Sequence, residues 1–196
     1  MEDSPKRTVS ARRKGRGLPE EKRILERYNA FKLGWLHDSI HFILLVLALF
    51  LLFRYVIGFS IVGGDSMSPT LQDGDVVMYL RLVPDYQAGD IISMRVPDGD
   101  YYIKRVVAVG GDTVALSDGR VLINGDAPEE FNRYGETQAE TATVIYPYAV
   151  QDGNVFVLGD NRAVSKDSRY FGEVRLRQIR GRIVFSLNRG GFRRPT

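Results

Sequence analysis

The chain has 196 residues, a length that fits one domain plus appendages, and a net charge of +3. Its 44% hydrophobic and 11% aromatic residues are typical of a folded protein, not a disordered one. It contains no cysteine, which excludes a disulfide scaffold, a thiolate zinc site and a thiol nucleophile.

The first 35 residues form a basic arm. Ten basic residues lie in it: Lys6, Arg7, Arg12, Arg13, Lys14, Arg16, Lys22, Arg23, Arg27 and Lys32. Such an arm can bind nucleic acid, but no recognisable nucleic-acid fold follows it. An apolar segment follows directly, and positive charge before such a segment indicates the cytoplasmic side of a membrane. We therefore expect a cytoplasmic arm over 1–35 and no nucleic-acid partner.

The segment 36–58 is predicted to be a transmembrane helix. It contains an unbroken run of twelve apolar residues, 42–53, and with its flanks it reaches the roughly 20 residues needed to cross a bilayer core about 30 Å thick. Trp35 and Tyr55 lie where interfacial aromatic residues belong. The charge asymmetry predicts a single pass in the cell membrane, with residues 59–196 outside.

Two other interpretations of this segment were weighed. A cleaved secretory signal also has an apolar stretch of this length, but the basic stretch before it is much longer than an ordinary signal has. His37 and His41 have the i,i+4 spacing of a metal pair, with Asp38 nearby. We interpret them as interfacial polar residues and expect no metal.

The part after residue 58 is predicted to be mainly β. Six glycine–aspartate pairs beginning at residue 74 separate short runs rich in valine, isoleucine and tyrosine, which is the pattern of strands joined by turns. The expected strands include 76–82, 91–96, 101–109, 121–123, 155–158 and 183–187. The polar segment 128–148 is expected to be a long surface loop.

A serine–lysine pair is the arrangement left for acyl-transfer chemistry. Ser66 lies among glycine and small residues just after the apolar segment. The usual base is histidine, but His37 and His41 both precede the serine and are expected on the other side of the membrane. Two Gly-Asp-Ser/Thr strings also resemble those of aspartic proteases, although Asp65 and Asp112 lack matching surroundings.

Lys104 is a candidate for the base. A lysine in water has a pKa of about 10.4, which burial lowers by as much as ~3–5 units. In a strand, Lys104 shares a face with Tyr102 and Val106, whereas Arg105 points the other way, solvated or paired. From these residues alone, an ordinary strand lysine and a serine that only stabilises its turn remain open alternatives.

Several blocks taken together resemble one family. In chain order they are the basic arm, the apolar segment, GDSMSPTL, GDIISMRVP, YYIKRVVAVGGDTV, VLING and GDNRAVSKDSRYFG. This order is similar to that of bacterial type I signal peptidases, membrane-anchored serine–lysine proteases, and in particular of Gram-positive-like members. The resemblance implies coiled antiparallel β-sheets, no cofactor, and removal of signal peptides from exported preproteins at the outer face of the cytoplasmic membrane. Its implied partners are those signal peptides and membrane lipid, with the export translocase close by.

The resemblance also implies roles for single residues. Ser66 matches the nucleophile and Lys104 the general base, while Ser165 matches a hydroxyl that orients the lysine. Asp167 and Arg169 match residues that brace the site. The pockets that select small residues at −1 and −3 are implied to include Met67, Leu71, Tyr102 and Ile103.

The chain departs from the family pattern at two places. Gly64 stands where some members have a serine that completes the oxyanion hole, and Ala163 and Val164 replace a polar pair. Two other functions therefore remain: a serine–lysine processing peptidase with narrow substrates, and a non-catalytic membrane-tethered β-module. Retention of Ser66, Lys104 and Ser165 together argues against the second.

Overall fold

The computed structural model describes residues 19–96, 99–140, 143–188 and 191–195. The chain divides into two compact units, with the boundary between Ala48 and Leu49.

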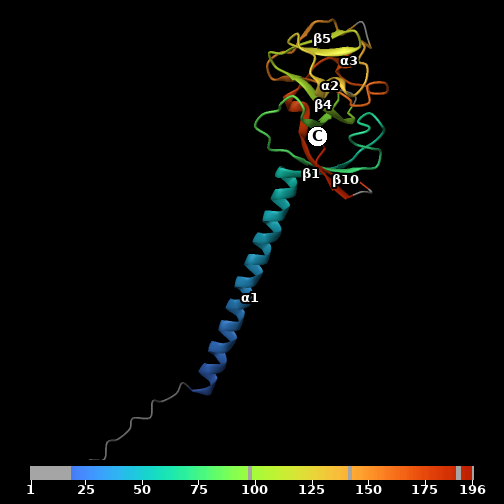
Figure 1. Cartoon of the computed structure of the whole chain (residues 1–196). Coiled ribbons are helices and arrows are strands. Elements are labelled where there is room, and N and C mark those ends of the chain that lie inside the picture. The colour runs from blue at the N-terminus through green and yellow to red at the C-terminus, as the bar shows by residue number, and fades with distance from the viewer. Residues whose placement is uncertain (1–18, 97–98, 141–142, 189–190, 196) are drawn as a thin grey trace, which may run out of the picture. The chain divides into compact units, whose positions relative to one another are not determined.

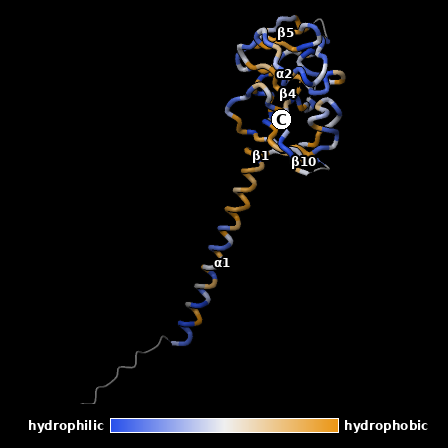
Figure 2. The backbone as a smooth tube through the Cα atoms, viewed as in Figure 1, coloured by the Kyte–Doolittle hydropathy of each residue, from blue (hydrophilic) through white to orange (hydrophobic). Residues whose placement is uncertain are grey.

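Helix α1, Glu20–Leu51, is the main element of the first unit and runs three residues into the second. Figure 2 shows its first part as a mixture of hydrophilic and hydrophobic residues and its second part as hydrophobic throughout. It is long and apolar enough to cross a membrane, by length and composition. The helix begins well before the expected boundary at residue 36, because the polar stretch before the apolar run is itself rich in helix-favouring residues. It also ends earlier: a π-helical turn, Leu52–Val56, leads into a strand at Ile57, so the segment 36–58 is not helical to its end.

The second unit is built on one large antiparallel sheet (Figure 1). Its path is β1-β2-β10-β3-β4-β8-β9, with β11 paired to β10, and the path does not close on itself. The strands are β1 (Ile57–Ile61), β2 (Val76–Leu80), β3 (Ile91–Arg95), β4 (Tyr101–Val109), β8 (Asn154–Leu158), β9 (Val174–Arg175), β10 (Ile179–Asn188) and β11 (Gly191–Arg193). The mainly β prediction is confirmed.

A smaller sheet has the order β6-β5-β7, and Figure 1 places β5 at the end of this unit opposite to β1 and β10. Its strands are β5 (Thr113–Ser117), β6 (Arg120–Ile123) and β7 (Tyr148–Ala149). The segment 128–148 is largely loop, as expected, with one short helix, α2 (Glu129–Asn132). Helix α3 (Ser168–Phe171) and a 3-10 turn (Leu176–Gln178) complete the unit.

Buried apolar side chains form three clusters in this unit. One of them contains Met67 and Leu71, from the turn that begins at Ser66, together with Val77, Tyr79 and Ile183 from strands β2 and β10. The turn that carries Ser66 is therefore fixed to the core of the large sheet.

Candidate active site

Ser66 lies in the loop that joins β1 to β2. The Leu71 amide donates to the Met67 carbonyl at 2.9 Å, so the loop forms a tight turn after Ser66. The Met67 and Leu71 side chains, 1% and 0% exposed, hold this turn against the core. The backbone N–H of Asn161 donates to the Ser66 carbonyl oxygen at 3.1 Å, which ties the turn to the segment after β8.

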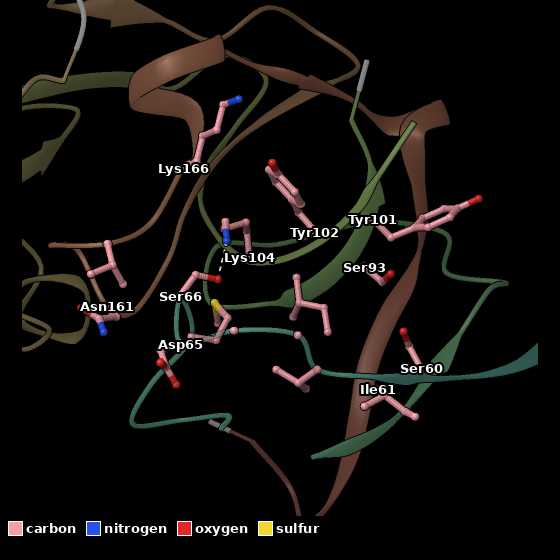
Figure 3. A pocket seen from close by; sticks show the side chains of 16 residues that line it. Ser60, Ile61, Asp65, Ser66, Ser93, Tyr101, Tyr102, Lys104, Asn161 and Lys166 are labelled. Carbon is pink, nitrogen blue, oxygen red and sulfur yellow. Dashed lines mark hydrogen bonds between the residues drawn. The ribbon is translucent and has the colours of Figure 1, made fainter. Parts of the chain in front are cut away.

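Lys104 is on β4, opposite Ile92 of β3, and points at the serine (Figure 3). Its Nζ donates a hydrogen bond to Ser66 Oγ at 2.6 Å and lies 5.3 Å from the centre of the Tyr102 ring. The side chain is 3% exposed. Burial lowers the pKa of Lys104 from 10.5 to about 8, against the opposing influence of the Asp167 and Asp160 carboxylates.

Arg105, the next residue on β4, is paired. It is 4% exposed and forms a two-pronged ion pair with Asp160, with Nε–Oδ1 and Nη2–Oδ2 distances of 2.8 Å. The Thr70 hydroxyl donates to the same carboxylate. Asp160 therefore joins β4, the end of β8 and the Ser66 turn. In the sequence Asp160 is recognisable only as part of a turn, although a buried arginine requires a carboxylate partner somewhere in the fold.

Asp167 and Arg169 organise the segment that follows β8. Asp167 is fully buried, caps helix α3, and accepts hydrogen bonds from the Gly159 amide and from the Arg169 guanidinium. Arg169 also donates to the carbonyl oxygens of Arg162 and Ser165. These contacts are of the bracing kind that the sequence analysis expected for the pair.

Ser165 lies in the same segment, but its hydrogen bonding differs from the expectation. Its Oγ is buried and has no hydrogen-bond partner within the described part of the chain, so the expected bond to Lys104 is not formed. The side chain packs against Gly159, where an added Cβ would collide with both Ser165 Oγ and the Ser66 carbonyl oxygen. Ser165 therefore lies near the backbone of Ser66.

A groove of about 450 Å³ runs past the serine and the lysine. Of the residues expected to select the substrate, Met67, Tyr102 and Ile103 line it. Leu71 is not among the lining residues of this groove and lies fully buried in the core cluster beneath the turn, so its role in substrate selection stays a prediction. Other lining residues were not predicted from the sequence, among them Ser60, Ser93, Tyr101, Asn161, Val164 and Lys166.

Gly64 adopts a left-handed backbone conformation, with φ of +78°, which a serine would adopt only with strain. Its N–H donates to Asp73 Oδ1 at 2.7 Å and is therefore engaged. The centres of the His37 and His41 rings lie 4.2 Å apart on α1. Among the described residues, no group of three or more side chains that could hold a metal ion occurs.

A serine oxygen hydrogen-bonded to a desolvated amine, beside an open groove, is an arrangement in which the amine can remove the hydroxyl proton during nucleophilic attack. Chemically, this places the site among those of hydrolases that use a serine nucleophile.

Comparisons with known proteins agree with this class. The signal peptidase family, peptidase S26, matches residues 35–188. The chain is 34% identical to signal peptidase I of Bacillus licheniformis, over 74% of this chain and 84% of that protein. It is 30% identical to signal peptidase IB of Staphylococcus aureus, over 70% and 81% of the two chains. The crystal structure of a signal peptidase I from Enterococcus faecalis is 33% identical, with a TM-score of 0.44, and the match covers 51% of this chain and 97% of that one. The chain belongs to the signal peptidase family, peptidase S26.

Proposed function

We propose that this chain is an endopeptidase that removes N-terminal signal peptides from exported preproteins, with Ser66 as nucleophile and Lys104 as general base. The observation that carries the proposal is the 2.6 Å hydrogen bond from Lys104 Nζ to Ser66 Oγ, made by a lysine that is 3% exposed. Membership of the signal peptidase family supplies the substrate class.

In the proposed mechanism, the neutral Lys104 amine takes the Ser66 proton as Oγ attacks the scissile carbonyl carbon. The negative charge that develops on the carbonyl oxygen is stabilised by the Ser66 backbone N–H, with a second donor from a group other than Gly64. Collapse of the tetrahedral intermediate breaks the peptide C–N bond, and Lys104 gives its proton to the leaving amine. A water molecule, deprotonated by Lys104, then hydrolyses the acyl-enzyme.

We infer that the groove selects the substrate. Met67, Tyr102 and Ile103 line it together with Ser66 and Lys104, and this supports a preference for small side chains at −1 and −3, where larger ones would clash. Asp167 and Arg169 hold the segment after β8 in place, and Ser165 sits against the Ser66 carbonyl as a positioning residue.

The proposal includes a location in the cell membrane. The apolar helical part of the expected segment, 36–56, spans the bilayer once, and residues 57–196, which begin with β1, form the catalytic domain outside. The basic arm, 1–35, of which 1–18 lie outside the described residues, stays in the cytoplasm. A signal peptide ends its apolar core at the outer interface, so an anchored protease meets its cleavage site there, beside lipid and close to the export translocase.

The test is cleavage of a purified preprotein by the full chain in detergent, with the fragments identified by mass. We expect the unmodified chain to cut after a small residue, and both Ser66→Ala and Lys104→Ala to abolish the cut. Activity surviving in either variant would contradict the assigned roles. If a folded, unmodified chain cleaves no preprotein, the non-catalytic module or a peptidase with narrow substrates replaces the proposal.

A further inference from the structure

The ring of Tyr134 lies against two buried guanidinium groups. Tyr134 follows helix α2 in the polar segment 128–148 and is half-buried. The guanidinium carbons of Arg105 and Arg162 lie 5.1 Å and 5.8 Å from the centre of its ring. Both arginines are almost fully buried, so contacts with protein groups, this ring included, must replace water around their charges.

Arg162 depends on such contacts more than Arg105 does. Arg105 has a carboxylate partner in Asp160, whereas within the described part of the chain Arg162 donates its hydrogen bonds to neutral oxygens. These oxygens are the carbonyls of Gly159 and Phe131 and the hydroxyl of Thr137. Burial lowers the pKa of Arg162 to about 10, so the group is still charged near neutral pH. The negative face of an aromatic ring stabilises such a charge without a carboxylate.

One chain of contacts leads from Tyr134 through Arg105 to the turn that carries Ser66. The Arg105 guanidinium holds Asp160 by its two-pronged ion pair, and the Thr70 hydroxyl in the turn donates to the same carboxylate. Tyr134 and Thr70 also line one open pocket of about 470 Å³. Loss of the ring would therefore expose the ion pair to water from this pocket and loosen its hold on the turn.

A second chain of contacts leads from Tyr134 through Arg162 to the same turn. Arg162 Nε donates to the Gly159 carbonyl oxygen at 3.0 Å. Gly159 lies so close to the Ser66 carbonyl oxygen that an added Cβ would collide with it. The Tyr134 ring thus contacts the first member of two separate chains that both end at the backbone around Ser66.

We propose that Tyr134 is a positioning residue: its ring holds the Arg105 and Arg162 guanidiniums in place, and through them the turn that presents Ser66 to Lys104. The proposal rests on the proposed peptidase function. Tyr134 is not among the residues that line the groove, so its effect is on the chemical step and not on substrate binding.

The test compares Tyr134→Leu with Tyr134→Phe in the full chain in detergent, with one peptide substrate that has alanine at −1 and −3. Tyr134→Leu should lower kcat by about tenfold, because small displacements of reacting groups are costly, and should leave KM within about twofold. Tyr134→Phe retains the ring and should keep kcat within about twofold.

Tyr148→Leu is the matched control. Tyr148 is a half-buried tyrosine of the same polar segment, and its ring packs against Phe156, at 5.4 Å between ring centres. No guanidinium of the described residues lies over it. Tyr148→Leu should therefore leave kcat unchanged at a temperature at which the chain stays folded.

Hydrogen exchange reports the position of the turn without any turnover. The Leu71 amide bonds to the Met67 carbonyl within the turn, and the Asn161 amide bonds to the Ser66 carbonyl. Relative to the amides of β4, which report global unfolding, both should exchange faster in Tyr134→Leu than in the unmodified chain. Their exchange should be unchanged in Tyr134→Phe and in Tyr148→Leu.

Circular dichroism checks that Tyr134→Leu is folded. If it is not, a phenylalanine with a trifluorinated ring replaces Tyr134, because it keeps the shape of the ring and weakens its negative face. The same changes are then expected at smaller size. Unchanged kcat and exchange, an equal loss of kcat in Tyr148→Leu, or a loss in Tyr134→Phe as large as in Tyr134→Leu would overturn the positioning role.

Failure of the proposed function is recognised separately, by a lack of cleavage or by cleavage that survives Ser66→Ala. In that case the exchange measurement decides alone. Faster exchange of the Leu71 and Asn161 amides in Tyr134→Leu, but not in Tyr134→Phe, supports the positioning role, and equal exchange in the two variants contradicts it.

Discussion

Lys104 links the stability of the fold to its chemistry through one proton. The folded chain holds the pKa of Lys104 at about 8, whereas the unfolded chain keeps the ordinary value of 10.5. Between these two pH values the unfolded state binds more protons, so the free energy of unfolding rises with pH through this window. Below about pH 8, Lys104 is charged in both the folded and the unfolded state. Burial of its ammonium group then lowers the free energy of unfolding by about 3 kcal/mol.

The first prediction concerns activity. Because the base must be neutral, kcat/KM should rise about tenfold per pH unit up to about pH 8 and level off above it. Hydrolysis of a peptide without titratable side chains, measured from pH 6 to 10, checks this. A flat profile below pH 8 would show that no group with this pKa acts as the base.

The second prediction concerns stability. Lys104→Met removes the buried amine at similar volume, so the inactive variant should be more stable at pH 7, by up to about 3 kcal/mol. The gain should shrink between pH 8 and 10.5. Denaturant unfolding at pH 7 and pH 10 measures it, with the exposed Lys166→Met as the matched control. A variant less stable than the unmodified chain at pH 7 would contradict the inferred penalty.

Among the elements, the pair formed by Arg105 and Asp160 fixes the Ser66 turn to β4 and β8. Both side chains are almost fully buried, so Arg105→Met leaves an unpaired carboxylate in the interior. We expect a loss of about 3–5 kcal/mol in the free energy of unfolding, together with a loss of activity. Replacing both residues, Arg105→Met with Asp160→Leu, should recover part of the stability. If the double variant is no more stable than Arg105→Met, the unpaired Asp160 carboxylate is not the cause of the lost stability.

The close approach of Gly159 to the nucleophile gives a fourth prediction. In Gly159→Ala, the new methyl group meets the Ser66 carbonyl and Ser165 Oγ, and the backbone contact cannot move aside as a flexible side chain would. We expect kcat to fall by at least about tenfold, since small displacements of reacting groups are costly. Gly34→Ala, where the added methyl meets nothing within 4 Å, is the control and should leave kcat unchanged.

Strand prediction from sequence succeeded where turn residues bounded β-branched runs, as in β3, β4 and β8. It failed at β1, because Ile57 and Phe59 continue the apolar run and look like the end of a membrane helix. Composition alone does not distinguish the two there. The strand is instead specified by pairing with β2, a partner well removed in sequence.

The sequence predicts those site residues that stand in recognisable motifs. Ser66 and Lys104 stand in recognisable blocks, and the structure brings them together. The sequence could not show that Leu71 is buried in the core, because whether a residue a few positions after Ser66 faces the groove or the core depends on the shape of the turn. Ser60 and Ser93 were missed because each is a single serine in an ordinary strand, and only the tertiary fold places them in the groove.

For the whole molecule, the fifth prediction concerns orientation. The chain has no cysteine, so single cysteines can serve as reporters: Ser10→Cys in the basic arm and Ser117→Cys on β5. In intact cells from which the outer layers have been removed, a membrane-impermeant thiol reagent should label Ser117→Cys only. Both should react after the membrane is permeabilised. Labelling of Ser10→Cys in intact cells would reverse the proposed topology.

The order of strands in the large sheet has a consequence for when the enzyme becomes active. Within the large sheet, the strand pairing that connects β1 and β2, which flank the Ser66 turn, to β3 and β4 runs through β10, because β10 lies between β2 and β3. Among the described strands of this path, β10 comes after all the others along the chain. Until it is in place, the sheet that holds the two halves of the site together is incomplete. Under the proposed function, we therefore expect a growing chain to have no peptidase activity before β10 has been made and has paired with β2 and β3.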